Sequence, residues 1–338
     1  MSGKGRPSVK KISEVTGFSP ATVSNALNMK RGVNRDTVER ILKVAEDLGY
    51  CMGGKELKSI KFVLFRRNGL IIDGSAFHPE VIEGVEQAAK ENGLNTLFVR
   101  LDRDDPDYEE QVGKLSLDMS CGVILLATEM QQEDFALFRN FKCPLVLLDG
   151  WCDGMLFDGV LINNEESAAL AVRYLAEKGH RDIGYIGGDF RIQAFRNREA
   201  GFRRAMREHS LEPRPAWCIT VGTKMETAYE GMLRYLEGEP ELPTAFFADN
   251  DLIALGAMKA LTEKGYRVPE DVSIVGFDNL PYSAISNPPL TTLQVHKQSM
   301  GHEAVERLLS IAERPQGARI KVECCTSFIE RESVKDFN

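Results

Sequence analysis

The stretch that decides the fold at the start of the chain is GFSPATVSNALN, which runs from Gly17 to Asn28. Gly17 interrupts a short run of periodically spaced apolar residues that begins at Val9. Ser19 can cap a second helix, and Pro20 suits the first position of that helix because its missing N–H has no partner there anyway. Two short helices joined by a tight glycine-containing turn, with small polar side chains on the second, are typical of a helix-turn-helix.

A third helix is expected after the capping sequence Asn34-Arg-Asp-Thr. The second helix is expected to bury Val23, Ala26 and Leu27, and the third to bury a stripe of Val38, Ile41, Leu42, Ala45 and Leu48. Three such helices could also form a plain bundle that binds nothing, but the distribution of charge argues against that alternative.

The charge of the chain is strongly segregated. Residues 1–61 hold 12 Lys and Arg against 6 Asp and Glu, whereas the remaining residues hold 30 against 44. A basic small domain on an acidic body suits phosphate binding by the first part only. We therefore expect the N-terminal helices to bind DNA.

The composition is that of an ordinary globular chain with room for two or three domains. Its 338 residues are 43% hydrophobic and 27% charged. No run of about 18 apolar residues is present, and the basic N-terminus has no apolar core behind it, so neither a membrane span nor a secretory signal is expected. The seven cysteines are scattered without CxxC spacing, which predicts free thiols and a cytoplasmic location.

From Ile60 onward short apolar strands alternate with helices. Residues 61–65 read as a buried strand and 78–91 as a helix, and the same alternation continues to about residue 275. This pattern predicts parallel sheets covered on both faces, and roughly ten such units suggest two α/β lobes rather than one. In such sheets ligands bind beyond the carboxyl ends of the strands or between the lobes.

Polar and aromatic residues at these expected strand ends are the candidates for ligand binding. Carboxylates, an arginine and aromatic faces converging on a cleft suit a polyhydroxylated ligand. The candidates are Phe77, Asp149, Trp151, Asp189, Arg198, Asp251 and Asp278. An aspartate at a strand end is as often only a helix cap, which leaves Asp149, Asp189 and Asp278 open, and Trp151 could equally be a packing residue.

The chain lacks the usual signatures of catalysis. It contains neither G-x-x-x-x-G-K-[ST] nor G-x-S-x-G, and its five histidines show no metal-ligand spacing. We expect no enzyme activity, no cofactor and no metal. A transport-type binding protein would need secretion and would lack the N-terminal helices, so that alternative is also disfavoured.

Several motifs together resemble one known family. TVSNALN and VNRDTVERILKVAEDLGY are similar to the DNA-binding headpiece of the lactose-repressor (LacI/GalR) family. The similarity continues along the body in GHRDIGYIGG (179–188), NREAGFRRAM (197–206), FADNDLIALGAMKAL (247–261), VPEDVSIVGFDN (268–279), PPLTTLQV (288–295) and FIERESV (328–334). The match covers nearly the whole chain in the order and spacing of the family.

The resemblance implies a domain plan. It consists of an all-α helix-turn-helix headpiece at 1–50, a short linker at 51–59, and a periplasmic-binding-protein-like body of two doubly wound parallel sheets. Residues 60–161 with 293–325 would form the N-terminal lobe, and 162–292 with 326–338 the C-terminal lobe.

The resemblance also implies site residues. Arg198 matches the arginine that grips the effector, and Asp251 matches an acidic partner on the other side. Phe77 lies where a cleft aromatic is usual, and Asp149 or Trp151 where the loop after the fourth strand reaches the ligand. With the strand-end residue Asp278, these residues form the expected effector set. Pro20, Ala21 and Asn25 occupy positions that read base edges, and Asn25 could pair with adenine, whereas Thr22 and Ser24 occupy positions that commonly hold phosphates. The full set assigned to DNA is Ser19, Pro20, Ala21, Thr22, Ser24, Asn25, Asn28 and Leu57.

The linker departs from the family pattern. Members usually carry a hinge helix after the headpiece that wedges leucines into the minor groove. Only residues 51–59 lie between Tyr50 and Ile60 here, with Gly53-Gly54 disfavouring a helix and Leu57 as the sole possible wedge. The hypothesis is that the hinge helix is absent or rudimentary. The chain also stops soon after RESV, so a homodimer without a tetramerising tail is expected.

The sequence thus predicts a transcriptional repressor whose affinity for double-stranded operator DNA is controlled by a small ligand, expected to be a carbohydrate. Two alternatives stay open: a regulator of the same class that answers a protein partner or a phosphorylated metabolite, and a sugar-binding protein that does not bind DNA. The sequence sets neither the effector, the operator nor the sign of the response.

Overall fold

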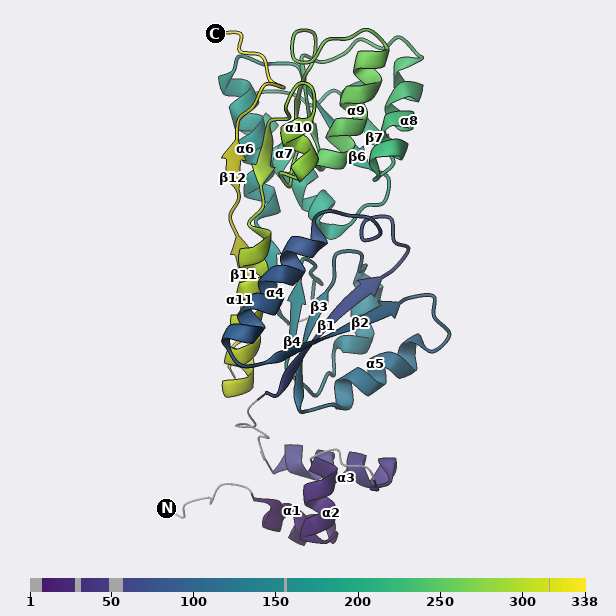
Figure 1. Ribbon diagram of the computed structural model, residues 1–338, viewed down its shortest axis with the longest axis vertical. Coiled ribbons are helices and arrows are strands. Elements are labelled where there is room, and N and C mark those ends of the chain that lie inside the picture. The colour runs from purple at the N-terminus through teal and green to yellow at the C-terminus, as the bar shows by residue number, and fades with distance from the viewer. Residues whose placement is uncertain (1–7, 28–31, 49–56, 155–156, 316) are drawn as a thin grey trace.

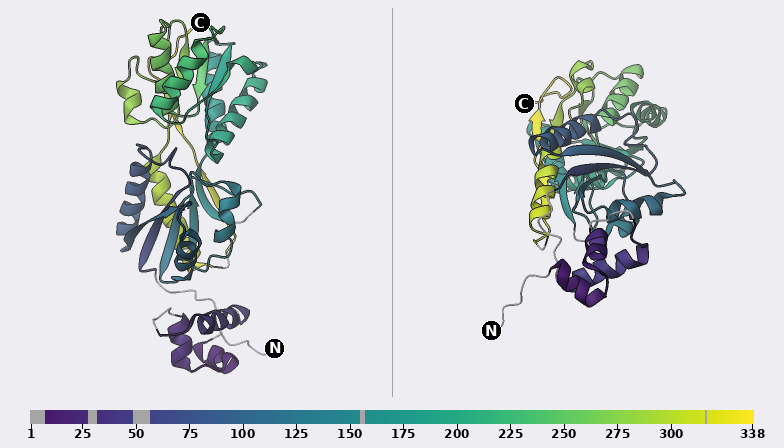
Figure 2. Two further views of the ribbon diagram at one scale, coloured as in Figure 1. Left: turned by 90° about the vertical axis from the view of Figure 1, so that its right-hand side faces the viewer. Right: turned by 60° about the horizontal axis from the view of Figure 1, so that its bottom comes forward.

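The computed structural model describes residues 8–27, 32–48, 57–154, 157–315 and 317–338. Three parts follow one another along the long axis of the molecule: three helices at the N-terminus, a lobe around a six-stranded sheet, and a second lobe that contains the C-terminus (Figure 1). The two lobes lie end to end when the molecule is turned by 90° (Figure 2). This arrangement confirms the expected helical headpiece and two-lobed α/β body.

The headpiece consists of α1 (Val9–Thr16), α2 (Pro20–Leu27) and α3 (Arg35–Asp47). Gly17 ends α1 in the left-handed conformation, with a φ of 74° that favours glycine. Ser19 caps α2 as predicted, because its Oγ accepts a hydrogen bond from the backbone N–H of Thr22 at 3.1 Å. The predicted apolar faces meet in one small core of Ile12, Val23, Ala26, Leu27, Ile41 and Ala45.

The N-terminal lobe is built on one parallel sheet in the order β11-β5-β4-β3-β1-β2. Its strands are β1 (Ser59–Arg66), β2 (Asn95–Asp102), β3 (Cys121–Leu126), β4 (Leu145–Leu148), β5 (Asp158–Ile162) and β11 (Lys321–Cys324). The helical elements of this lobe are α4 (His78–Glu91), α5 (Tyr108–Leu117), η1 (Gln132–Phe138) and α11 (Lys297–Glu313). Fully buried β3 and β4 explain why their sequences read as continuous apolar runs.

The C-terminal lobe has a four-stranded parallel sheet in the order β7-β6-β8-β9. Its strands are β6 (Ile183–Gly188), β7 (Cys218–Val221), β8 (Ala245–Ala248) and β9 (Ser273–Val275). The helical elements are α6 (Asn164–Glu177), α7 (Gln193–Glu208), η2 (Pro215–Trp217), α8 (Met225–Leu236), α9 (Asp251–Glu263) and α10 (Pro281–Ile285). An antiparallel pair, β10 (Thr292–Gln294) and β12 (Ser327–Ile329), runs beside this lobe.

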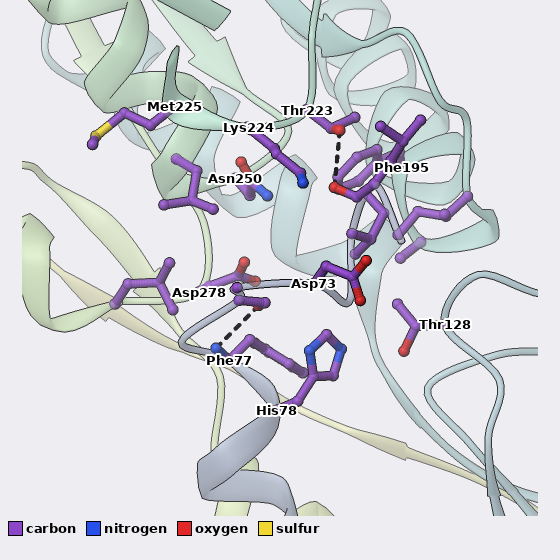
Figure 3. Close-up of a pocket in the computed structure, with 18 of the residues that line it drawn as sticks. Asp73, Phe77, His78, Thr128, Phe195, Thr223, Lys224, Met225, Asn250 and Asp278 are labelled. Atoms are coloured by element: carbon purple, nitrogen blue, oxygen red, sulfur yellow. Dashed lines mark hydrogen bonds between the residues drawn. The ribbon is translucent and has the colours of Figure 1, made fainter. Parts of the chain in front are cut away.

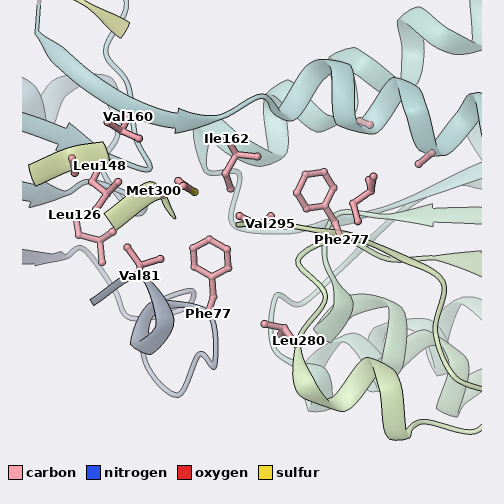
Figure 4. Close-up of a cluster of buried hydrophobic side chains, with 14 of the residues drawn as sticks. Phe77, Val81, Leu126, Leu148, Val160, Ile162, Phe277, Leu280, Val295 and Met300 are labelled. Carbon is pink, nitrogen blue, oxygen red and sulfur yellow. The ribbon is translucent and has the colours of Figure 1, made fainter. Parts of the chain in front are cut away.

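The chain passes between the lobes three times, after β5, between β10 and α11, and between β11 and β12. A single apolar core continues across this side of the molecule and includes Phe77, Ile162, Phe277, Leu280 and Val295 (Figure 4). Because residues of both lobes share that core, the crossings form a packed hinge. The packed hinge fixes which strand ends of one lobe face those of the other.

Glycine residues allow α4 and α11 of the N-terminal lobe to pack closely against each other. A Cβ atom added to Gly84 of α4 would lie 2.1 Å from the carbonyl oxygen of Gln298, and one added to Gly301 of α11 would lie 2.3 Å from that of Val81. Backbone atoms occupy these positions, so a larger residue would push the two helices apart. The position of α4 therefore depends on glycine, and α4 begins with the cavity residue His78.

Candidate effector cavity and DNA-binding helix

A cavity of about 410 Å³ lies between the two lobes. Its walls follow the carboxyl ends of β1, β3 and β4 in one lobe and of β6, β7, β8 and β9 in the other, as expected for parallel sheets. Figure 3 shows side chains from both lobes pointing into it. Of the residues predicted for effector binding, Phe77, Asp149, Arg198 and Asp278 line this cavity.

Arg198 is held rigidly in the wall of the cavity. Its Nε donates to Asn164 Oδ1 at 2.8 Å, its Nη1 donates to the carbonyl oxygen of Asp249, and its Nη2 pairs with Asp278 Oδ1 at 3.3 Å. The guanidinium carbon lies 3.5 Å from the centroid of the Phe277 ring. A buried arginine fixed in this way offers a pre-oriented donor to a ligand at little entropic cost.

Two carboxylates from opposite lobes line the cavity. Asp149 follows β4 and accepts a hydrogen bond from Thr128 Oγ1 at 2.7 Å, while Asp278 follows β9. The backbone φ angle is positive at both residues, 56° at Asp149 and 105° at Asp278, a conformation that residues other than glycine rarely adopt. Burial raises the pKa of Asp149 to about 6, and the charge of Asp278 adds to that increase. Burial also raises the pKa of Asp278. Neither carboxylate caps a helix in this structure.

His78 follows Phe77 in the stretch expected after the first strand of the body, and it lines the cavity although it was not included in the expected effector set. Only 4% of its surface is exposed, and neither ring nitrogen has a hydrogen-bond partner within the described part of the chain. Burial lowers its pKa to about 4, so the ring is neutral at pH 7 and offers one donor and one acceptor. The adjacent Phe77 ring lies edge-on at 5.4 Å (Figure 3). Buried polar atoms of this kind need a partner, which a bound ligand would supply.

The structure places Asp251 and Trp151 outside this cavity. The Asp251 carboxylate is fully buried and accepts hydrogen bonds from the backbone N–H of Leu280, from the Ser283 hydroxyl and from the Thr292 hydroxyl. The Trp151 ring instead packs against Gly159. Asn250, the residue before Asp251, lines the cavity in its place, and Asp189 does not line it.

The predicted DNA-binding residues that the structure describes lie on or directly before α2. Ser19, Pro20 and Ala21 are exposed, whereas Thr22, Ser24 and Asn25 are half-buried. Positions 20, 21, 24 and 25 share one face of the helix, opposite the face that Val23 and Ala26 bury. Asn28 and linker residues 51–56 lie outside the described residues.

Leu57 does not occupy the position expected of a minor-groove wedge. Only 8% of its surface is exposed, and its side chain belongs to the apolar core of the body. The next residue, Lys58, donates its backbone N–H to Ser120, and β1 begins at Ser59. In this structure the chain is anchored in the N-terminal lobe from residue 57, so a minor-groove contact by Leu57 would require its side chain to leave this core; that assignment stays a prediction.

Among the residues that the structure describes, no helix is long and apolar enough to span a bilayer. The same residues contain no cluster of three or more His, Cys, Asp or Glu side chains that could hold a metal ion.

Comparisons with known proteins agree with this arrangement. A family model described as "Periplasmic binding protein-like domain" matches residues 172–334. The transcriptional repressor PurR of Haemophilus influenzae strain PittEE is 34% identical over 337 residues, which cover 97% of this chain and 98% of that protein. The PurR repressor of Pasteurella multocida strain Pm70 is 32% identical with the same coverage.

Solved structures show the same fold. A complex of the transcriptional regulator CelR with cellobiose matches with a TM-score of 0.73 at 24% identity, covering 97% of this chain and all of that one. The Lac repressor dimer bound to operator and the anti-inducer ONPF matches with a TM-score of 0.71 at 23% identity, covering 97% and 99%.

The helical headpiece, the packed hinge and the cavity between the lobes are those of a DNA-binding regulator under ligand control. Its body has the fold of a periplasmic-binding-protein-like domain. The chain belongs to the LacI family of transcriptional regulators and is a DNA-binding repressor under ligand control rather than an enzyme.

Proposed function

We propose that this repressor responds to a neutral carbohydrate, of monosaccharide or disaccharide size, bound between its lobes. The observation that carries the proposal is the lining of the cavity. Phe77 and Phe195 supply apolar faces for sugar C–H groups, while Asp149, Arg198 and Asp278 supply acceptors and a donor for hydroxyls. A volume of about 410 Å³ is in the range of small-molecule sites.

The two free nitrogens of His78 support the same class of ligand. A neutral imidazole needs one acceptor and one donor from its partner, and a hydroxyl can serve as either. The ring lies in the first turn of α4, next to Phe77, so a hydroxyl that bonds to it sits beside an aromatic face. An amphipathic sugar ring satisfies both neighbours at once.

The charges of the cavity disfavour a phosphorylated effector. Among the described residues, four carboxylates line it, those of Asp73, Asp149, Glu226 and Asp278, against two cations, Arg198 and Lys224. Arg198 is already paired with Asp278. A phosphate would have to enter against this negative excess, whereas an uncharged ligand would not.

The proposed mechanism couples effector binding to operator binding through the relative orientation of the two lobes. An effector that touches both lobes binds most tightly to one relative orientation of them, and the N-terminal lobe carries the headpiece through its linker. Operator affinity then changes by the difference between the effector's affinities for the two orientations. The proposed operator contacts are those of α2, with Pro20, Ala21 and Asn25 facing the bases.

A thermal-shift screen of the full chain tests the proposed ligand. The panel contains neutral mono- and disaccharides, sugar phosphates, polyols, nucleobases and nucleosides. A ligand at 100 times its Kd adds about 2.7 kcal/mol to the free energy of unfolding. We expect stabilisation by a neutral sugar that is lost in His78→Leu. Stabilisation only by a nucleobase or a sugar phosphate would contradict the proposal.

We further propose that the chain works as a homodimer through an apolar groove of the C-terminal lobe. Met225, Leu255 and Met258 line this groove together with Tyr282 and Ile285 of α10. The Ile285 side chain is 80% exposed and that of Tyr282 is 49% exposed, which is costly for a surface that stays in water. A second copy of the chain would cover them and present two headpieces to a two-fold symmetric operator.

Ile285→Asp is expected to weaken this dimer at least tenfold, because the interface would bury an unpaired carboxylate. Sedimentation velocity at several protein concentrations measures the change. Leu137→Asp is the matched control, since Leu137 is also exposed, at 43%, but lies on η1 of the other lobe. Unchanged sedimentation of Ile285→Asp would argue against the groove as the dimer surface.

A further inference from the structure

The loop that follows β1 is held in place by one buried carboxylate. Glu129 is fully buried, and its two oxygens accept hydrogen bonds from five backbone N–H groups of this loop. Its Oε2 serves Arg67, Asn68 and Gly69, and its Oε1 serves Ile71 and Ile72, at distances from 2.8 to 3.1 Å. A second anchor is the ion pair of the Arg67 guanidinium with the buried Asp134.

The anchored loop reaches the opposite lobe. Thr223, after β7, donates its hydroxyl to the carbonyl oxygen of Leu70 at 3.2 Å (Figure 3). Ile71 packs against a small apolar cluster of the C-terminal lobe, formed by Ile192, Ala194 and Phe195. Leu70, Ile71 and Asp73 of the loop also line the effector cavity, so the loop is both a wall and a contact between the lobes.

The segment that supplies the anchor makes a second contact between the lobes. Gln131, two residues after Glu129, accepts a hydrogen bond at its Oε1 from Arg196 Nη2 at 2.8 Å. Its Nε2 donates to the carbonyl oxygen of Arg191 at 3.4 Å. Both partners belong to the C-terminal lobe. Glu129 therefore ties together two neighbouring segments that each touch the other lobe.

We propose that residues 67–73 form a latch that holds the lobes closed over the effector cavity, and that Glu129 is the residue that positions the latch. The proposal rests on the function proposed above, because it takes the cavity as the effector site. The packed hinge joins the lobes through Ile162, Phe277 and Val295, and the latch joins them through Leu70 and Ile71. The effector cavity is lined by residues of both regions, with Phe77 and Leu280 from the hinge core and Leu70 and Ile71 from the latch.

This arrangement predicts that part of the free energy favouring the closed orientation of the lobes comes from contacts within the protein. The contacts that the loop and Gln131 make with the other lobe join protein atoms only, so they contribute to the closed orientation independently of an effector. An effector then needs to supply only the rest of the free energy that favours the closed orientation. Weakening the latch should leave each lobe folded while the lobes separate more often.

Hydrogen exchange of the full-length, ligand-free protein, followed by mass spectrometry, tests the latch. The test variant is Glu129→Gln, which has one acceptor oxygen in place of two and sets an NH₂ group against backbone donors. We expect exchange at least tenfold faster in residues 68–73 and also in residues 190–196 and 222–225 of the other lobe. Peptides from β3 should exchange as in the wild type, since they report the core of the N-terminal lobe.

Two further variants make the result decisive. Glu133→Gln is the matched control, because Glu133 lies on the same segment and its side chain is 61% exposed; it pairs with Arg67 Nη2 at 2.8 Å, while the ion pair of Arg67 with Asp134 and the backbone bonds to Glu129 stay in place. It should exchange as the wild type does. Thr223→Val removes the bond to Leu70 but leaves Glu129 intact, so exchange should rise in 222–225 and not at the amides that Glu129 holds.

The latch is overturned if Glu129→Gln frees residues 68–73 while 190–196 and 222–225 exchange as in the wild type. If β3 also exchanges faster in Glu129→Gln, this substitution unfolds the N-terminal lobe, and the test of the latch then depends on Thr223→Val alone. An unchanged profile for Thr223→Val would refute the latch in that case. Since no effector is present, these outcomes are independent of the ligand screen, so the latch and the carbohydrate proposal can fail separately.

Discussion

Arg198→Ala is expected to abolish the effector response while operator binding without effector persists. The guanidinium bonds to Asn164 and to the Asp249 carbonyl, and it pairs with Asp278 inside the cavity. Removal leaves the Asp278 carboxylate buried without its cation, a change that costs about 3–5 kcal/mol in comparable buried pairs. The variant also loses a charged donor for the ligand, worth roughly 1.5–3 kcal/mol for each hydrogen bond.

The measurement compares operator affinity of wild type and variant with and without the stabilising ligand. The headpiece has its own apolar core, which contains Ile12, Val23 and Ile41 and shares no residue with the cavity, so DNA binding should be preserved. Arg204→Ala is the matched control, since Arg204 lies on the same helix but pairs with Glu165 and Glu166 at the surface. Equal loss of both activities in Arg198→Ala would count against this division of labour.

Asn25→Ala is expected to have the largest effect on DNA binding. Asn25 lies on the face of α2 that the headpiece core leaves accessible. A bidentate contact from asparagine to adenine is worth about 1–3 kcal/mol for each base pair. A dimer reads two half-sites, so the loss would be about 2–6 kcal/mol, or at least thirtyfold in affinity. Effector binding should not change.

A comparison with Thr22→Val separates base reading from phosphate contact. Loss of a phosphate contact weakens binding by a similar factor on every DNA sequence, whereas loss of a base contact also relaxes specificity. Competition with operators altered at single positions measures the difference. If Asn25→Ala keeps its full sequence preference, Asn25 is not a base-reading residue. The melting temperature of the headpiece checks that neither variant acts by unfolding it.

The elements of this fold follow from local features of the sequence. The glycine-containing turn at Gly17, the cap at Ser19 and the apolar stripe of α3 lie within a few residues of one another, so propensity and periodicity predict them. The alternation of buried strands with helices likewise predicts two parallel sheets. It also predicts candidate residues beyond the carboxyl ends of the strands. Asp149 and Asp278 directly follow β4 and β9, whereas Phe77 directly precedes α4 and Arg198 lies within α7; all four line the cavity.

The tertiary structure decided which of the strand-end residues face the cavity. Asp251 and Asn250 are neighbours in sequence, yet Asp251 turns to the hydroxyls of Ser283 and Thr292, while Asn250 lines the cavity. Those hydroxyls come from segments 32 and 41 residues away, and no local pattern carries that information. The place of His78 in the cavity wall is likewise set by distant residues, because α4, which begins at His78, is positioned by its packing against α11.

The local elements, the parallel sheets and the sheet edges that line the proposed effector cavity therefore follow from the sequence alone. Two features depend on the tertiary structure: Leu57 packs in the apolar core of the body, and Glu129 holds the backbone of the loop above the cavity. The physical reason is the range of the interactions. Periodicity and capping act over a few residues, whereas a buried side chain is directed by atoms that folding brings from distant parts of the chain.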